Sequence, residues 1–239
     1  MRFLIGYAAP LTGPQSIVGI PMLRVVEMAV SDARRDNWDL NVVAVDDQAD
    51  ESVAAEVAQQ LCDDASVIAV VGHKNSGPSR AGGAIYAAAG LTQVAQCATD
   101  NALTRSGWRT FFRLCADNET QAAVAADYAR TYLKPSRVAA VHDGTGYGRP
   151  LVDAFAARLK AFGAGPVVTL RVWVWQQDFG PTVDAIRSAD ADLVYIGATE
   201  IEGSKLTIAL RAAQIDAQVI TSEGGPHNPF PRLAGEAAE

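Results

Sequence analysis

The sequence is poor in features that mark several classes of protein. It has only three cysteines in 239 residues; Cys62, Cys97 and Cys115 form neither a metal-type spacing nor a disulfide framework, and we expect buried thiols. No apolar run approaches the roughly 20 residues that a membrane-spanning helix needs, so we expect no direct membrane insertion. The net charge is −7 and there is no basic cluster, which argues against nucleic acid as a partner.

What remains is the composition of an ordinary soluble globular protein, with 49% hydrophobic and 20% charged residues. The length allows one large or two modest domains. Met1 and Arg2 lead straight into the apolar run Phe3–Tyr7, so no signal peptide is visible. An exported protein would look the same if the sequence began at its mature end.

Short apolar runs alternate with amphipathic segments through the first half of the chain, which predicts parallel strands joined by helices. The predicted strands are Phe3–Ala8, Leu40–Val45, Val67–Val71, Leu91–Ala95 and Phe111–Leu114. The first helix is expected at Ile20–Arg35, a second opens at Asp50 and Glu51, and another covers Glu119–Leu133.

The same alternation restarts in the second half. The strands expected there are Arg137–Val141, Val167–Trp173, Leu193–Ile196 and Gln218–Thr221. The prediction is therefore an α/β chain of two doubly wound parallel-sheet lobes joined by a hinge, residues 1–116 and 117–239.

The stretch Val67–Thr104 is the most informative part of the chain. It predicts a helix with Ser76 as its N-cap and Gly90 as its end, and its expected buried face is Ala81, Ala84, Ile85 and Ala88. Two neighbouring strands would bring Ser76 and Thr99 to one sheet edge, where open α/β sheets bind ligands. Free N–H groups at the helix start favour an anion such as a carboxylate. The alternative is that Ser76 is only a cap and Thr99 only a turn residue.

Short motifs spread over the whole chain have a recognisable order and spacing. They are Pro10-Leu11-Thr12-Gly13-Pro14, Asp46-Asp47, Ile85-Tyr86, Leu103-Thr104, Phe112-Arg113, Val141-His142-Asp143, Tyr147-Gly148, Asp178-Phe179 and Glu223-Gly224. Together they resemble the type I periplasmic binding proteins of branched-chain amino-acid ABC transporters, the leucine/isoleucine/valine-binding group.

The resemblance implies a pocket between the two lobes. In the first lobe, the hydroxyls of Ser76 and Thr99, with main-chain groups near Cys97 and Ala98, would hold the ligand's α-carboxylate and α-ammonium. In the second lobe, Tyr147 would close over the ligand, and the remaining candidate, Glu223, would bind the ammonium.

The sequence departs from the pattern of this family in three places. Val18 stands where many members have an aromatic beside the side-chain pocket, and Thr199 where many have a tyrosine that helps to bind the ammonium. The chain ends at Ala234–Glu239, near the point where the family's chain returns to the first lobe. The resemblance therefore implies that the C-terminal return segment is missing.

Catalytic chemistry finds little support in the residues. His142 is the best candidate for a proton shuttle, but structural hydrogen bonding at a strand end explains it better. Cys97 has no His, Lys or Arg in its motif that would lower the pKa of its thiol. The loop Gly144–Gly148 lacks the third glycine and the later acidic residue of a dinucleotide site. We therefore expect no catalytic residue, no cofactor and no bound metal.

Two functions from different classes remain. The first is an extracytoplasmic or periplasmic solute-binding protein that captures a small amino acid, branched-chain or related, and delivers it to an ABC permease. The alternative is a ligand-sensing module of a receptor or regulator with the same fold, which binds an amide or a small carboxylate. Fold alone does not separate the two.

Overall fold

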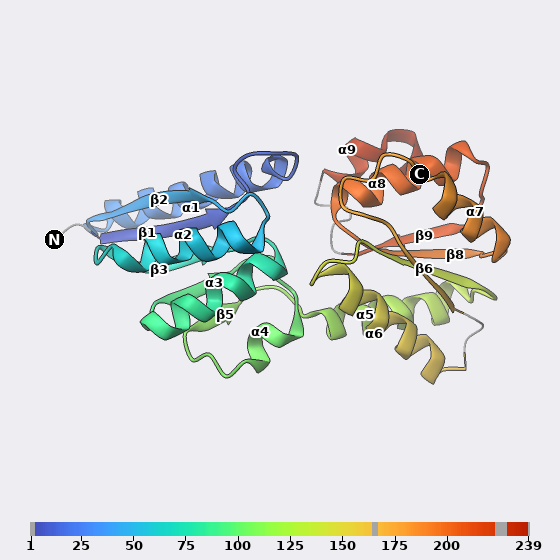
Figure 1. Cartoon of the computed structure of the whole chain (residues 1–239), viewed down its shortest axis with the longest axis horizontal. Coiled ribbons are helices and arrows are strands. Elements are labelled where there is room, and N and C mark those ends of the chain that lie inside the picture. The colour runs from blue at the N-terminus through green and yellow to red at the C-terminus, as the bar shows by residue number, and fades with distance from the viewer. Residues whose placement is uncertain (1–2, 164–166, 223–228, 239) are drawn as a thin grey trace. The chain divides into compact units, whose positions relative to one another are not determined.

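The computed structural model describes residues 3–163, 167–222 and 229–238. The chain divides into two compact units, Met1–Asp117 and Asn118–Glu239, each with its own parallel sheet (Figure 1). Most of the polar side chains discussed below follow the carboxyl ends of these strands.

The first unit contains a five-stranded parallel sheet in the order β2-β1-β3-β4-β5. Its strands are β1 (Phe3–Ala9), β2 (Leu40–Asp46), β3 (Val67–Gly72), β4 (Thr92–Ala95) and β5 (Phe111–Arg113). Its helices are α1 (Ser16–Arg35), α2 (Glu51–Asp63), α3 (Ser76–Ala89) and α4 (Asn101–Arg105). The doubly wound parallel sheet expected from the alternating pattern is confirmed.

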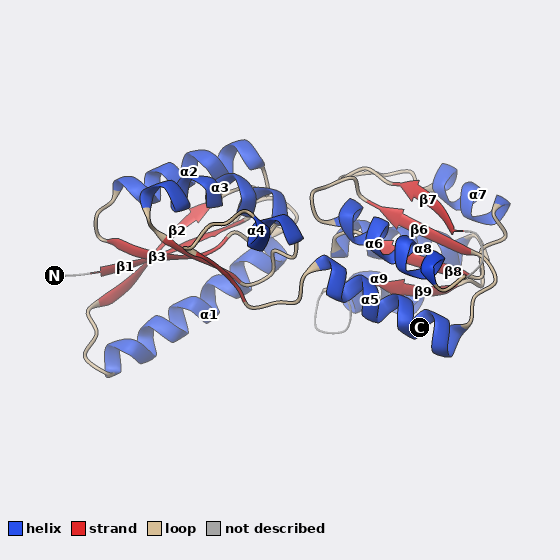
Figure 2. Cartoon of the chain, turned by 90° about the horizontal axis from the view of Figure 1, so that it is seen from below, coloured by secondary structure: helices blue, strands red, loops and turns tan. Residues whose placement is uncertain are grey.

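Helices cover the two faces of this sheet unequally. Figure 2 shows α1 on one face and α2 with α3 on the other. The buried core lies under α2 and α3, where Leu61, Val70 and Tyr86 are at most 3% exposed. On α1, by contrast, Val25 and Met28 remain exposed.

Two helix predictions in the first unit were wrong in detail. Helix α1 begins at Ser16 rather than Ile20, because the backbone N–H and hydroxyl of Ser16 both donate to Gly13 O and start the first turn early. In α3, Ala84 is exposed and the buried face contains Gly82 and Gly83 instead. Ala88 is likewise exposed.

These two glycines allow close packing that a periodicity of apolar residues does not reveal. A Cβ on Gly82 would lie 2.5 Å from His73 Nε2, and one on Gly83 would lie 2.7 Å from Trp108 Cζ3. The helix therefore approaches β3 and the Trp108 ring through its smallest residues.

The second unit contains a four-stranded parallel sheet in the order β7-β6-β8-β9. Its strands are β6 (Val138–His142), β7 (Val167–Arg171), β8 (Leu193–Gly197) and β9 (Gln218–Thr221). Its helices are α5 (Asn118–Tyr128), α6 (Gly148–Ala161), α7 (Gly180–Ser188), α8 (Glu200–Ala212) and α9 (Phe230–Ala234), followed by a short 3₁₀ helix, Gly235–Ala238.

Each face of this second sheet has its own apolar core. On one face, α7 and α8 pack Ile186 and Leu206 against β6 and β8. On the other, α5 packs Ala122 and α6 packs Leu151 and Phe155 against the same strands, and the centroids of the stacked Phe155 and Tyr195 rings lie 3.9 Å apart. The chain therefore buries both faces of β6 and β8, as expected for central parallel strands.

One predicted helix of this unit is two different elements. The segment expected as a single helix at Glu119–Leu133 is α5 followed by a π-helical turn, Ala129–Leu133. The turn ends at Lys134 in a left-handed conformation with φ 50°. Such π-helical turns carry no distinct hydrophobic period, so the apolar pattern alone did not separate them.

Candidate functional site

Ser76 joins the two loops that follow β3 and β4. Its hydroxyl oxygen accepts hydrogen bonds from the backbone N–H groups of Thr99 and Asp100, both at 3.2 Å. The expected proximity of Ser76 and Thr99 is confirmed. The cap prediction was wrong: Asn75 is the N-cap residue, without a side-chain cap bond, and Ser76 is the first helical residue.

Arg113 supports the same loop from β5. Its guanidinium donates to Asp100 O at 2.8 Å, to Thr104 Oγ1 at 3.2 Å and, more weakly, to Ala98 O at 3.5 Å. Only 7% of the Arg113 side chain is exposed. A buried cation therefore fixes the carbonyl groups of the loop that carries Thr99.

Several buried polar atoms at this edge of the sheet have no hydrogen-bond partner in the described part of the chain. They are Thr99 Oγ1, Asn75 Oδ1 and both amide atoms of Gln96. Buried polar groups are almost always paired. A group of unpaired ones on two adjacent loops is typical of a place where a ligand supplies the missing partners.

The loop after β1 completes the edge and brings Val18 to it. The Tyr7 hydroxyl donates to Gly19 O at 2.7 Å, and a Cβ on Gly19 would lie only 2.0 Å from Pro10 O. This close approach holds the start of α1, with half-buried Val18, against the end of β1.

Cys97 lies half-buried near the same tyrosine, whereas Ala98 is fully buried. Burial, followed by the charges of Asp47 and Cys97, raises the pKa of Tyr7. Cys62 and Cys115 are also half-buried rather than fully buried. The expectation of buried thiols was therefore only partly correct.

In the second unit, Tyr147 is held at both ends. Its hydroxyl donates to Ser222 Oγ at 2.6 Å, and its carbonyl accepts from the Asn118 side chain at 3.3 Å. Ser222 Oγ in turn lies 3.4 Å from Ala198 O. The phenol is thus oriented by the residue that directly precedes Glu223. Glu223 itself lies outside the described residues.

Thr199 is tied into a buried acidic cluster of the second unit. Its hydroxyl donates to the carboxylate of Glu202, and its backbone N–H donates to Asp143 Oδ2 at 3.3 Å. Burial, and to a lesser extent the charge of Glu202, raises the pKa of Asp143 against the hydrogen bonds from Thr145. Sequence reasoning missed Glu202, although its place in the first turn of α8, after a strand, was a usable signal.

His142 and His73 have structural roles. His142 Nδ1 accepts a hydrogen bond from the Gly144 N–H at 2.9 Å, as expected for a strand end. Burial, followed by the charge of Arg149, lowers the pKa of His142. His73 is fully buried, with Nδ1 2.7 Å from Asp47 Oδ2 and Nε2 3.1 Å from the Tyr86 hydroxyl.

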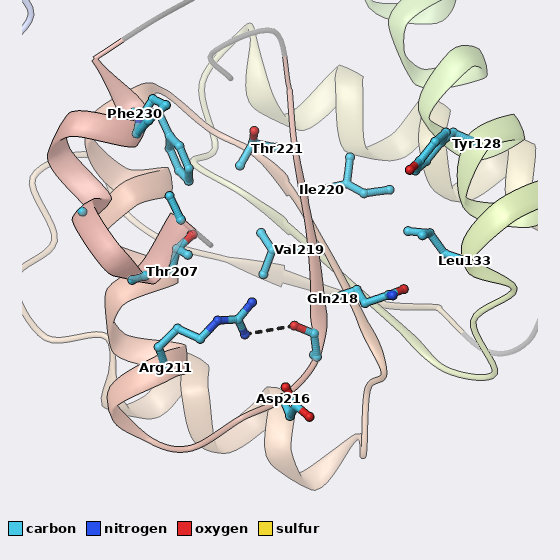
Figure 3. A pocket seen from close by; sticks show the side chains of 15 residues that line it. Tyr128, Leu133, Thr207, Arg211, Asp216, Gln218, Val219, Ile220, Thr221 and Phe230 are labelled. Atoms are coloured by element: carbon cyan, nitrogen blue, oxygen red, sulfur yellow. Dashed lines mark hydrogen bonds between the residues drawn. The ribbon is translucent and has the colours of Figure 1, made fainter. Parts of the chain in front are cut away.

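A cavity of about 910 Å³ lies elsewhere, along the edge strand β9. Figure 3 shows Tyr128 and Leu133 on one side of the strand and Arg211 on the other. The Arg211 guanidinium donates to Ala217 O at 3.0 Å. Among the described residues, no predicted site residue lines this cavity.

Two features are absent from the residues that the structure describes. Within them, no group of three or more His, Cys, Asp or Glu side chains is arranged to hold a metal ion. Across the same ranges, no helix combines the length and apolar character that crossing a membrane requires.

Two parallel α/β units with polar groups gathered at their strand ends define a class of two-lobed ligand-binding proteins. The periplasmic binding protein family matches residues 4–239. The chain belongs to this family.

Curated relatives and solved structures agree with this assignment. The chain is 29% identical over 240 residues to the Leu/Ile/Val-binding protein homolog 1 of Brucella melitensis, covering 99% of this chain and 64% of the relative. It is 30% identical over 225 residues to an amino acid binding protein of Pseudomonas aeruginosa, covering 92% of this chain and 60% of the relative. The chain thus spans less than two thirds of these relatives.

The solved structures show the same fold at lower identity. The leucine-binding protein LivK of Thermotoga maritima superposes with a TM-score of 0.89 at 23% identity, covering 99% of this chain and 68% of that one. The substrate-binding protein LivJ of Streptococcus pneumoniae, in complex with isoleucine, gives 0.89 at 21% identity, covering 98% and 68%. Together they confirm the type I periplasmic-binding-protein fold.

Proposed function

We propose that this protein is an extracytoplasmic solute-binding protein that captures a small amino acid and delivers it to an ABC permease. The observation that carries the proposal is the family match over nearly the whole chain. The curated relatives, which are named for binding amino acids, support the ligand class. Periplasmic localisation and the permease partner follow from the same family.

In the first unit, the ligand's α-carboxylate would lie against Ser76 and Thr99. Ser76 Oγ already accepts two N–H groups, so its own proton is available to donate. Thr99 Oγ1, buried and without a hydrogen-bond partner among the described residues, supplies a second donor. Main-chain groups of Cys97 and Ala98 lie on the same loop.

In the second unit, the oriented phenol of Tyr147 would cover the ligand, and Glu223 would bind the ammonium. Thr199 is proposed only to orient Glu202, because its hydroxyl already donates to that carboxylate. Val18 would line the ligand's side chain from the first unit. Each of these residues would only bind or position the ligand, and none of these roles requires a covalent bond to be made or broken.

A thermal-shift screen of the intact chain with amino acids, amides and small carboxylates tests the proposal. A ligand that binds only the folded state raises the midpoint, by about 2.7 kcal/mol of added stability at a hundredfold excess over its Kd. We expect at least one amino acid to raise it. A screen in which no amino acid moves the midpoint, while amides or simple acids do, would favour the sensing alternative.

A further inference from the structure

Asn75 has a buried side-chain oxygen at the carboxyl edge of the first sheet. The residue lies in the loop after β3 and directly precedes Ser76. Its Oδ1 atom is buried and has no hydrogen-bond partner among the described residues. Because a buried amide oxygen without a donor is unfavourable, its lack of a partner requires an explanation.

The usual role of an asparagine at the start of a helix does not explain this oxygen. Asn75 is the N-cap residue of α3 and has an extended backbone, with φ −88° and ψ 148°, as capping residues do. The side-chain oxygen of such a residue typically accepts a backbone N–H of the first turn. Asn75 makes no such side-chain bond. Its oxygen is therefore not used by the helix that follows it.

Gln15 fixes the orientation of the Asn75 amide. Asn75 Nδ2 donates to Gln15 Oε1 at 2.8 Å. The same oxygen of Gln15 accepts from the Lys74 ammonium at 3.3 Å. Because an ammonium can only donate, the Gln15 atom that both groups contact must be the oxygen, and the Asn75 atom that faces it must be the nitrogen. Asn75 Oδ1 is therefore on the branch of the amide that does not contact Gln15.

The contacts of Gln15 place Asn75 on the side of the site where Val18 lies. Gln15 is 5% exposed, and its carbonyl oxygen accepts the backbone N–H of Val18 at 3.1 Å. In the sheet, β3 lies between β1 and β4. Ser76 bonds to the loop after β4, whereas Asn75 bonds to the loop after β1. A ligand whose carboxylate lies against Ser76 would therefore meet Asn75 with its side chain.

The buried oxygen of Asn75 favours a ligand side chain that donates a hydrogen bond. An amide oxygen accepts hydrogen bonds and cannot donate them. An aliphatic side chain beside it would exclude water and leave it without a donor. A hydroxyl or an amide N–H would supply that donor. Sites with a buried polar group discriminate strongly against the ligand analogue that leaves this group unpaired.

We propose that Asn75 is a specificity-determining residue whose Oδ1 accepts a hydrogen bond from the ligand's side chain. This protein then prefers an amino acid with a side-chain hydroxyl or amide to a hydrocarbon of the same shape. The inference rests on the proposed amino-acid-binding function and narrows its ligand class. Gln15 is a positioning residue for the Asn75 amide.

Two pairs of amino acids with nearly the same shape test the inference by isothermal titration of the intact protein. Threonine has a hydroxyl where valine has a methyl group, and asparagine has an amide where leucine has an isopropyl group. We expect at least one polar member to bind about tenfold or more tightly than its hydrocarbon partner. A preference within the first pair identifies a hydroxyl as the donor, and a preference within the second pair identifies an amide.

Variants of Asn75 connect the preference to this residue. Asn75→Leu removes the oxygen and keeps the branched shape, so it should weaken the polar ligand about tenfold or more and remove the preference. Asn75→Asp retains an oxygen acceptor and should retain the preference. Gln60→Leu, which removes an amide exposed on α2, is the control and should leave every affinity unchanged. If Asn75→Leu does not fold, the unmodified protein and Asn75→Asp decide the question.

Three results would overturn the inference. In the first, the unmodified protein binds valine and leucine at least as tightly as threonine and asparagine, which leaves the proposed function intact. In the second, Asn75→Leu weakens polar and hydrocarbon ligands equally, because Asn75 would then serve a group common to both, such as the ammonium. In the third, none of the four amino acids binds, and the thermal-shift screen with the other amino acids then decides the proposed function separately.

Discussion

Single residues at the edge of the first sheet combine structural roles with the binding roles proposed above. Ser76 shows this most clearly, because its hydroxyl oxygen accepts two buried N–H groups from the neighbouring loop. The sequence predicted that Ser76 would lie near Thr99, since both follow adjacent parallel strands. It did not predict this hydrogen-bonding role, because a serine before a helix is far more often an N-cap.

Ser76→Ala should therefore destabilise the fold as well as weaken binding. It leaves the N–H groups of Thr99 and Asp100 buried without an acceptor, at a cost of roughly 2–4 kcal/mol in the free energy of unfolding. Urea unfolding without ligand measures this loss. Ser16→Ala, which removes a hydroxyl that donates to Gly13 O, is the control and should cost under about 1 kcal/mol. Equal losses for the two variants would show that Ser76 does not join the loops.

Among the elements, strands were easier to predict than helix details. Every strand of both sheets lies within two residues of a run of apolar residues that marked it in the sequence, because buried parallel strands need such runs. Helix α3 was misjudged because glycines form its packed face, and a glycine adds nothing to an apolar period. The junction of α5 with the π-helical turn was missed because such a turn carries no distinct hydrophobic period.

Alanine substitutions at two helical glycines, Gly19 and Gly203, should have opposite effects on stability. A Cβ on Gly19 in α1 would lie 2.0 Å from Pro10 O, whereas one on Gly203 in α8 would meet nothing closer than 3.6 Å. Gly19→Ala should therefore force the helix away from the β1 loop and cost about 1–3 kcal/mol. Gly203→Ala should be neutral or stabilise by up to about 1 kcal/mol, since alanine favours the helix.

Thermal unfolding of the two glycine variants beside the unmodified protein checks the pair. The midpoint should fall for Gly19→Ala and hold or rise for Gly203→Ala. Changes of the same sign and size in both would mean that the close contact at Pro10 does not constrain the start of α1.

At the scale of the whole molecule, the sequence predicted the fold class and the family more fully than the binding groups. Motif order identified two α/β lobes and a family of binding proteins. The burial of Lys74 and the acidic cluster of Asp143 and Glu202 were not foreseen. Their signal is burial of charged residues beside strand ends, which becomes visible only when side-chain exposure and hydrogen bonds are known.

Under the proposed function, this protein binds an amino acid without changing it. Isothermal titration of the intact chain with the amino acid that raises its melting midpoint most, followed by mass spectrometry of the recovered ligand, tests this claim most directly. The proposed function predicts saturable binding of one ligand per chain and recovery of that ligand chemically intact. Absence of saturable binding by any amino acid, or recovery of the ligand as a different compound, would contradict it.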